Sequence, residues 1–117
     1  MEETRQENGN GNGNGNGNDR LQEIIWQVLT EVERATEKFP TWPTDPIHAL
    51  AVLGEEFGEL TKEVLQMCYE PWKTSHAAIE TEAIQTAAMS IRFLLNLNSY
   101  KYGPQEQHSQ DAQKGVE

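Results

Sequence analysis

Residues 45–67 read DPIHALAVLGEEFGELTKEVLQM, and this stretch decides the fold class. Asp45 is a good helix N-cap, and Pro46 suits the first helical position. Apolar residues then recur at alternating spacings of three and four, which predicts an amphipathic helix with one buried seam: Leu50, Leu53, Phe57, Leu60, Val64 and Met67. Pro71 should end this helix.

The segment before it predicts a first helix that begins near Asn18 or Asp19 and ends before Pro40. Its apolar residues follow the same spacing: Leu21, Ile24, Ile25, Val28, Leu29, Val32 and Ala35. The connector 39–46, FPTWPTDP, contains three prolines and should be stiff. Alternation typical of a strand does not occur over any useful length, so the sequence predicts an all-α fold.

A third helix is expected from Thr74 or Ser75 to about Asn98, with Gly103 and Pro104 as its stop signal. Its apolar residues fall on several faces, which indicates a helix buried nearly all round. Three helices of this size cannot bury one of their own on every side. We therefore expect a compact helical bundle, three main helices per chain, completed in a homo-oligomer (a dimer or a tetramer).

The two ends of the chain differ in composition from the middle. Residues 8–18 read NGNGNGNGNGN, a repeat without apolar side chains that cannot offset its own ordering entropy. We expect a disordered tail over 1–18, one folded domain over 19–103, and a polar, flexible C-terminal tail over 104–117.

The charge balance and the single cysteine limit the function classes. A formal net charge of −10 argues against a nucleic-acid polymer as partner, although a divalent cation can join carboxylates to a nucleotide. No segment has the length of a membrane span or the layout of a signal peptide. Cys68 alone excludes an internal disulfide, and a reducing compartment, the cytoplasm, is expected.

Carboxylates are concentrated in LGEEFGEL, residues 53–60. Glu55, Glu56 and Glu59 are three or four residues apart, so they project from neighbouring helical positions and repel one another. Glu82 lies on an otherwise apolar side of the third helix, where an unpaired carboxylate is costly. Inward carboxylates from two helices would form an oxygen site that suits Mg²⁺ or Mn²⁺. The alternative is a solvated acidic face on a structural adaptor.

Two segments together resemble a known family. DPIHALAVLGEEFGELTKEVLQ followed by ETEAIQTAAMSIRFLLNL is similar to the MazG-like branch of the all-α nucleoside-triphosphate pyrophosphohydrolases, over roughly residues 38–98. That family carries EExxE on one helix and ExxD on the next. Glu55, Glu56 and Glu59 match the first motif in full. Glu82 matches the start of the second, but Gln85 stands where the aspartate is expected.

The resemblance implies that Glu56, Glu59, Glu82 and the Gln85 position hold Mg²⁺, for which Mn²⁺ can substitute. It also implies hydrolysis of a (d)NTP to a (d)NMP and pyrophosphate, with Glu56 and Glu59 as part of the catalytic set. We assign Glu55 as the residue that orients the attacking water. The amide oxygen of Gln85 can ligate a hard cation, but unlike an aspartate it carries no negative charge. The alternative is therefore a nucleotide- or metal-binding protein whose catalysis is weakened.

Substrate-binding candidates lie outside the motifs. Trp42 and Trp72 on the connectors are candidates for stacking on a nucleobase, or they cover the small core. Arg92 is a candidate phosphate donor, but it would equally complement a helix C-terminus or pair with a glutamate. Lys101 is a further phosphate candidate.

Overall fold

Three long helices form the described part of the chain. The computed structural model describes residues 13–103, and within them it contains no strand, which confirms the all-α class. Two short 3₁₀ segments, η1 and η2, follow the second and third helices. The elements in order are α1 Gly13–Lys38, α2 Pro46–Tyr69, η1 Pro71–Lys73, α3 His76–Leu95 and η2 Leu97–Ser99.

The predicted capping residues start two of the helices. The Asp45 carboxylate accepts a hydrogen bond from the backbone N–H of Ile47 at 2.9 Å, and Pro46 occupies the first position of α2. Ser75 caps α3 by accepting from the N–H of Ala78 at 3.1 Å. Each side chain satisfies an N–H that has no partner within its own helix.

The start of α1 differs from the prediction. The helix begins at Gly13 rather than near Asn18 or Asp19, so its first turns lie in the Asn-Gly repeat. Starting a helix requires three residues to be fixed for the first hydrogen bond, whereas extending it requires only one residue per hydrogen bond. A stable helix can therefore extend into a segment of low helix propensity. Residues 1–12 of the expected N-terminal tail and the expected tail 104–117 lie outside the described residues.

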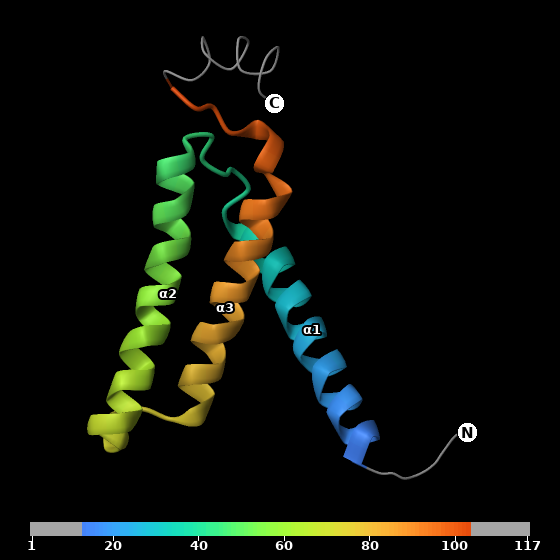
Figure 1. Cartoon of the computed structure of the whole chain (residues 1–117), viewed down its shortest axis with the longest axis vertical. Coiled ribbons are helices and arrows are strands. Elements are labelled where there is room, and N and C mark those ends of the chain that lie inside the picture. Colours follow the sequence, from blue (N-terminus) through green and yellow to red (C-terminus); the bar gives the residue numbers. More distant parts are fainter. Residues whose placement is uncertain (1–12, 104–117) are drawn as a thin grey trace, which may run out of the picture.

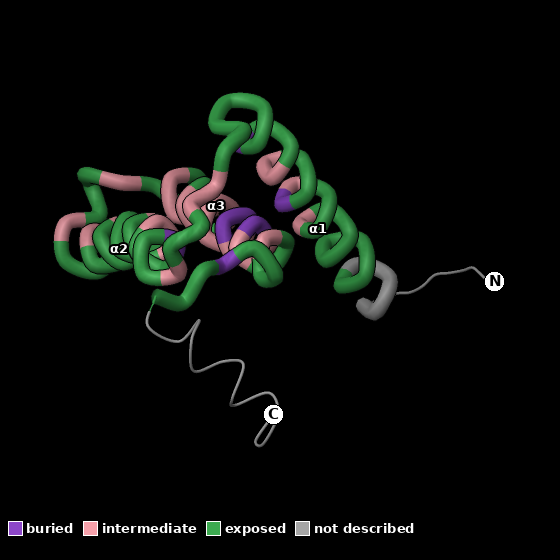
Figure 2. The backbone as a smooth tube through the Cα atoms, turned by 90° about the horizontal axis from the view of Figure 1, so that it is seen from above, coloured by how far each residue is buried: buried purple, intermediate pink, exposed green. Residues whose placement is uncertain are grey.

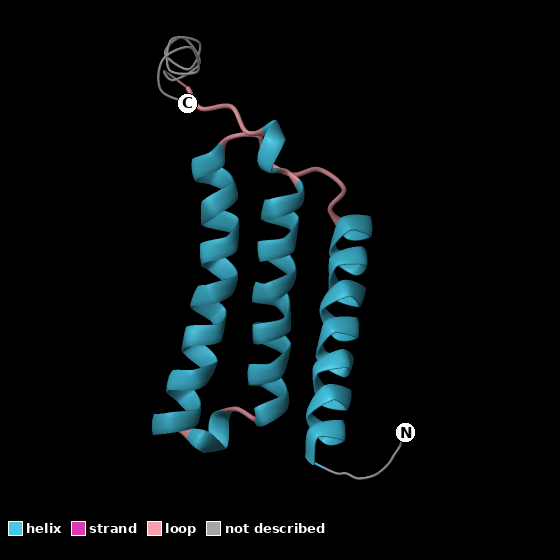
Figure 3. Ribbon diagram, turned by 45° about the vertical axis from the view of Figure 1, so that its right-hand side comes forward, coloured by secondary structure: helices cyan, strands magenta, loops and turns pink. Residues whose placement is uncertain are grey.

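The three helices lie side by side with α3 in the middle (Figures 1 and 3). Helix α3 packs against both α1 and α2, whereas the described backbones of α1 and α2 do not approach each other closely. The chain runs in the same direction in α1 and α3 and in the opposite direction in α2 (Figure 1). One chain is therefore an open layer of helices, and it leaves two broad faces of α3 without a covering helix.

The core is small because only one layer of side chains is shared between neighbouring helices. Val28 and Ala35 of α1 pack with Ala88 and Met89 of α3, and further apolar residues surround them in part. Buried positions follow the middle of the layer, while most of α1 and α2 remains exposed (Figure 2). Ala88 is fully buried in this cluster, and Ala49 of α2 is fully buried as well.

The predicted single buried seam of α2 is wrong in its extent. Its residues separate into two rows with a seven-residue spacing. Leu53, Leu60 and Met67 are partly buried in the row toward α3. The other row is Leu50, Phe57 and Val64, with exposed fractions of 56%, 60% and 41%. A seam of this width needs helices on two sides, and the described chain supplies only one.

Within residues 13–103, no helix combines the length and the apolar character needed to cross a bilayer.

Candidate functional site

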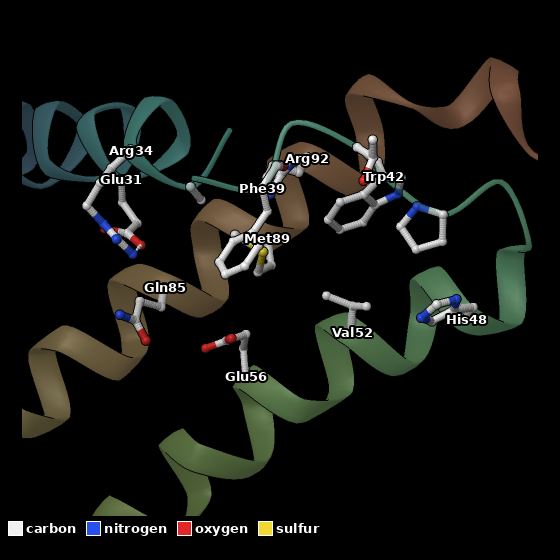
Figure 4. A pocket seen from close by; sticks show the side chains of 13 residues that line it. Glu31, Arg34, Phe39, Trp42, His48, Val52, Glu56, Gln85, Met89 and Arg92 are labelled. Carbon is white, nitrogen blue, oxygen red and sulfur yellow. Dashed lines mark hydrogen bonds and ion pairs between the residues drawn. The ribbon is translucent and has the colours of Figure 1, made fainter. Parts of the chain in front are cut away.

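A pocket of about 370 Å³ opens on one broad face of the layer. The second half of α1, the connector 39–45, the first half of α2 and the second half of α3 surround it (Figure 4). One end of the pocket carries acidic and amide side chains, and the other carries aromatic rings. Its main lining residues are Glu31, Arg34, Phe39, Trp42, His48, Val52, Glu56, Gln85, Met89 and Arg92.

Glu56 and Gln85 reach the acidic end from the facing helices α2 and α3 (Figure 4). The pKa of Glu56 is raised, first because the carboxylate is partly desolvated and then because Glu82 and other carboxylates repel it. Two of those carboxylates, Glu55 and Glu59, belong to the same motif, and a third, Glu31, comes from α1. Negative charge from three helices therefore acts on one partly buried carboxylate.

Glu82 extends this acidic region along the contact between α3 and α2. Its pKa is raised by partial burial and by repulsion from Glu59 and Glu63, and Lys62 opposes that rise. Glu63 accepts a hydrogen bond from the hydroxyl of Thr74. We call Glu31, Glu56, Glu59, Glu63 and Glu82 the acidic cluster. The glutamates predicted to bind a metal thus repel one another across the contact between α2 and α3.

The donor set of the cluster fits a hard divalent cation, because it consists of carboxylate oxygens with one nearby amide. Among the described residues, Glu56, Glu59 and Glu82 form no ion pair with lysine or arginine. Within 13–103 no three acidic, histidine or cysteine side chains are close enough together to hold a metal ion. The oxygen donors therefore suit a hard cation by type, but in the described residues their side chains do not converge on one position.

At the other end of the pocket, hydrogen bonds fix the ring of Trp42. Its Nε1–H donates to the hydroxyl of Tyr100 at 2.8 Å, and that hydroxyl donates to the carbonyl of Phe93 at 3.0 Å. The guanidinium of Arg92 lies 5.0 Å from the centre of the Trp42 ring. The chain thereby holds a flat aromatic surface in place on the pocket wall, which is the geometry that stacking on a planar ligand requires.

Arg92 lines the pocket, but one of its donors is already used. Its Nη2–H donates to the carbonyl of Phe39 at 2.7 Å, directly after the end of α1. The side chain is buried, and burial lowers its pKa from the ordinary arginine value. Arg92 therefore complements the C-terminal end of α1, a contact with a different helix from its own.

Five predicted site residues do not line the pocket: Glu55, Glu59, Glu82, Trp72 and Lys101. Glu59 is exposed on α2 and Glu82 is half-buried on α3, both within the acidic cluster. Glu55 is exposed on α2, although its charge acts on Glu56. Trp72 is 76% exposed in η1, at the opposite end of α2 from the connector 39–45. A helix of 24 residues spans about 36 Å, so the two connectors cannot contribute to one small pocket. Lys101 is exposed, and its backbone N–H donates to the carbonyl of Thr44.

The sequence interpretation missed the three other titratable side chains that line the pocket: Glu31, Arg34 and His48. Glu31 had a detectable signal, because it lies seven residues after Ile24 and three after Val28, within the apolar stripe of α1. A charged residue in such a stripe requires a partner or a ligand. Arg34 follows one turn later and pairs with Glu31. His48 had no comparable signal, because it lies outside the apolar seam of α2.

Compared with family models, curated proteins and solved structures, the chain matches none of them. A group of partly desolvated carboxylates adjoins a pocket with a fixed aromatic wall. That combination suits a ligand with a planar group at one end and anionic oxygens at the other.

Proposed function

We propose that the chain is a MazG-like, Mg²⁺-dependent nucleoside-triphosphate pyrophosphohydrolase that converts a (d)NTP to a (d)NMP and pyrophosphate. One observation supports this proposal most strongly. Carboxylates of the EExxE motif on α2 and Glu82 on α3 repel one another beside a pocket with aromatic walls. A soluble adaptor has no need to place unneutralised carboxylates at a helix contact, where they destabilise the fold.

In this proposal Glu56, Glu59 and Glu82 hold the cation, and Gln85 adds a neutral oxygen. When bound, Mg²⁺ offsets charge on the phosphate oxygens and lowers the pKa of a coordinated water. The chain itself binds the base against Trp42, whose ring is fixed by Tyr100. Met89 and Val52 line the same pocket and exclude water from that end.

Glu55 is the proposed water-orienting residue. It is solvent-exposed and lies one residue before Glu56, so its carboxylate has access to water while remaining close enough to act on Glu56. A carboxylate in this position would accept a proton from the attacking water as the water oxygen bonds to the α-phosphorus, while the bond from that phosphorus to the bridging oxygen breaks and pyrophosphate leaves.

A second candidate function is nucleotide binding with weakened catalysis, and Gln85 favours it. Gln85 lines the pocket from α3 where the motif of the resembled family has an aspartate. The amide leaves the site with one negative charge fewer, which weakens cation binding. The two candidates differ in a single measurable property, because only the enzyme produces pyrophosphate in the presence of bound nucleotide.

We also propose that the chain acts as a homo-oligomer in the cytoplasm, with a second copy on the face opposite the pocket. At 100° per residue, exposed apolar side chains on all three helices point away from the pocket-lining positions. We call them the back face: Leu21, Ile25, Leu29, Leu50, Phe57, Val64 and Leu94. Gly54 lies in the same region, where a Cβ would meet no atom within 4 Å, so a second helix can approach closely.

The test is pyrophosphate release from a panel of standard and oxidised (d)NTPs, with and without millimolar Mg²⁺. We expect release that requires Mg²⁺ and is lost in Glu56→Gln and Glu59→Gln. Glu33→Gln is the matched control, because Glu33 is an exposed glutamate of α1 that does not line the pocket. Nucleotide binding without pyrophosphate from any substrate would favour the second candidate, and neither binding nor release would refute both.

A further inference from the structure

Helix α2 carries an uninterrupted stripe of uncharged residues on the surface that faces away from α3. The stripe consists of Ile47, Leu50 and Ala51 and of the residues that follow each of them at intervals of seven, as far as Cys68. We call these ten residues the α2 stripe, and every one of them is exposed. At 100° per residue, the α2 stripe lies roughly 100° round the helix from the partly buried row that packs toward α3.

The α2 stripe has the size and the period of an interface between helices. Its large members Ile47, Leu50 and Phe57 are 72%, 56% and 60% exposed. Together the ten residues present on the order of 500–800 Å² per copy, and a specific interface needs about 500 Å² or more from each partner. A seven-residue period keeps one side of a helix against a partner helix over several turns. The α2 stripe therefore fits another long helix.

We propose that helix α2 of a second copy covers the α2 stripe, antiparallel to the first, with the twofold axis between Phe57 and Gly58. This inference specifies the interface of the homo-oligomer proposed above, and it does not depend on hydrolysis. In an antiparallel pair with this centre, the α2 stripe coincides with itself. Ile47 is level with the partner's Cys68, and Gly54 is level with the partner's Thr61. Each stripe residue is likewise level with a stripe residue of the other copy.

The residues beside the axis allow the two helices to pack closely. A twofold axis brings each residue next to it against its own equivalent, so Phe57 meets the partner's Phe57 on one side. Gly58 meets the partner's Gly58 on the other side. A Cβ at Gly54 or Gly58 would meet no atom within 4 Å, so both positions leave room for a second backbone. The two rings then pack beside a close helix contact, which favours association.

The charges that border the α2 stripe favour the antiparallel orientation. Glu55 and Lys62 are exposed and border the stripe on the same side. In a parallel pair each of them would meet its own like charge, which is unfavourable. In the antiparallel pair, Glu55 is two residues, or about 3 Å along the axis, from the level of the partner's Lys62. Charges at the border of a helix pair select its orientation in this way.

The native cysteine allows the orientation to be tested by cross-linking. Cys68 lies 21 residues after Ile47 on the same helix, a distance of about 31 Å. The antiparallel pair therefore keeps the two copies of Cys68 about as far apart and places each beside the partner's Ile47. A parallel pair would place the two copies of Cys68 side by side. A bismaleimide that spans the distance between packed helices, about 8–10 Å, distinguishes the two arrangements.

We expect the reagent to leave the wild type as single chains in a denaturing gel and to convert Ile47→Cys into linked dimers. The same helix is too long for a link within one chain. The double variant Ile47→Cys, Cys68→Ser is the matched control, since it again has one cysteine and should give no dimer. Light scattering of the untreated proteins should give the same mass for all three.

A second pair of variants tests the α2 stripe without any reagent. Gly58→Lys places two ammonium groups against each other beside the axis, and it should raise the dimer Kd by at least about tenfold. Glu59→Lys puts the same side chain one residue later, outside the α2 stripe, and should leave the dimer Kd unchanged. Because a Cβ at Gly58 meets no atom of its own chain, circular dichroism should show equal helix content in both variants.

Linked dimers of the wild type, or of the double variant, would overturn the antiparallel arrangement, and so would Ile47→Cys without linked dimers. A dimer that tolerates Gly58→Lys would overturn the α2 stripe as the interface, while the homo-oligomer proposed above would stand on the rest of the back face. A monomeric wild type at high concentration would overturn both. None of these results decides the hydrolase, which is tested separately by pyrophosphate release.

Discussion

Replacing Glu82 by glutamine should have opposite effects on stability with and without a divalent cation. The Glu82 carboxylate repels Glu56, Glu59 and Glu63 and is attracted by Lys62. Each like-charge pair at such positions costs about 0.2–0.5 kcal/mol. Three repulsions less one attraction give about 0.5–1 kcal/mol, so without cation the variant should melt about 2–8 °C above the wild type.

Addition of Mg²⁺ should reverse this order. Cation at about 100 times its Kd stabilises the native state by about 2.7 kcal/mol, which raises the melting temperature of a domain of this size by about 10 °C or more. Glu82→Gln removes a negatively charged ligand and should lose most of that rise. The wild type should therefore be the more stable protein in millimolar Mg²⁺ and the less stable one in EDTA.

The pH dependence provides an internal check. In the folded protein the pKa of Glu82 and that of Glu56 both lie above the ordinary glutamate value of 4.5. For an acid with a raised pKa, ionisation destabilises the fold, and this cost disappears as pH falls through the range just above 4.5. In EDTA, the advantage of Glu82→Gln over the wild type should accordingly be present at pH 7 and absent near pH 4.5.

The assay is thermal unfolding followed by circular dichroism at low ionic strength, with Glu80→Gln as the matched control. Glu80 lies on the same helix two residues earlier, but it pairs with Arg20 at 3.5 Å. Its replacement should not stabilise the protein and should preserve the Mg²⁺ response. A Glu82→Gln variant that melts with the wild type in EDTA, or gains as much from Mg²⁺, would refute the reasoning.

Three further predictions follow from particular contacts. Gln85→Asp should strengthen Mg²⁺ binding about tenfold in calorimetry by adding a charged oxygen ligand, and unchanged affinity would place that position outside the site. Arg92→Met should lower the free energy of unfolding by about 2–4 kcal/mol, measured by urea unfolding. The Phe39 carbonyl loses its hydrogen-bond donor, and the contact of the guanidinium with the Trp42 ring is lost. A smaller loss of stability would show that water replaces the guanidinium. Phe57→Ser should shift the chain toward monomer in light scattering, since Phe57 is an exposed part of the back face, and an unchanged mass would place the interface elsewhere.

Local signals in the sequence predicted the helices well. Asp45, Pro46 and Ser75 act through contacts with residues two or three positions away, so their effect is visible in the sequence alone. The predicted start of α1 was wrong. Composition shows that ordering the Asn-Gly repeat is costly, but it does not show how far an adjacent helix extends into the repeat.

The packing of α2 was predicted less well. Spacings of three and four identify an apolar face, but they do not say how many helices cover it. Leu53 and Phe57 belong to the same pattern, yet Leu53 is partly buried toward α3 and Phe57 is exposed. The spacing was therefore correct, and the inference that one chain buries the whole seam was not.

The acidic cluster shows which parts of a site local motifs reveal. Glu56 and Glu59 were found because they share a helix, and Glu82 was found because its own helix is apolar around it. Glu31 was missed, since only the packing of α1 beside α3 brings it into the pocket. Trp72 was grouped with Trp42 because both lie on connectors, and nothing in the sequence showed that these connectors are at opposite ends of α2.

The most direct test of the central claim is a titration with Mn²⁺ followed by electron paramagnetic resonance, in the wild type, Glu56→Gln, Glu82→Gln and Glu80→Gln. If carboxylates of α2 and α3 hold one divalent cation between them, the wild type and Glu80→Gln should remove Mn²⁺ from solution with equal affinity. Glu56→Gln and Glu82→Gln should each bind it at least about tenfold more weakly. Equal Mn²⁺ binding by all four proteins would contradict the account.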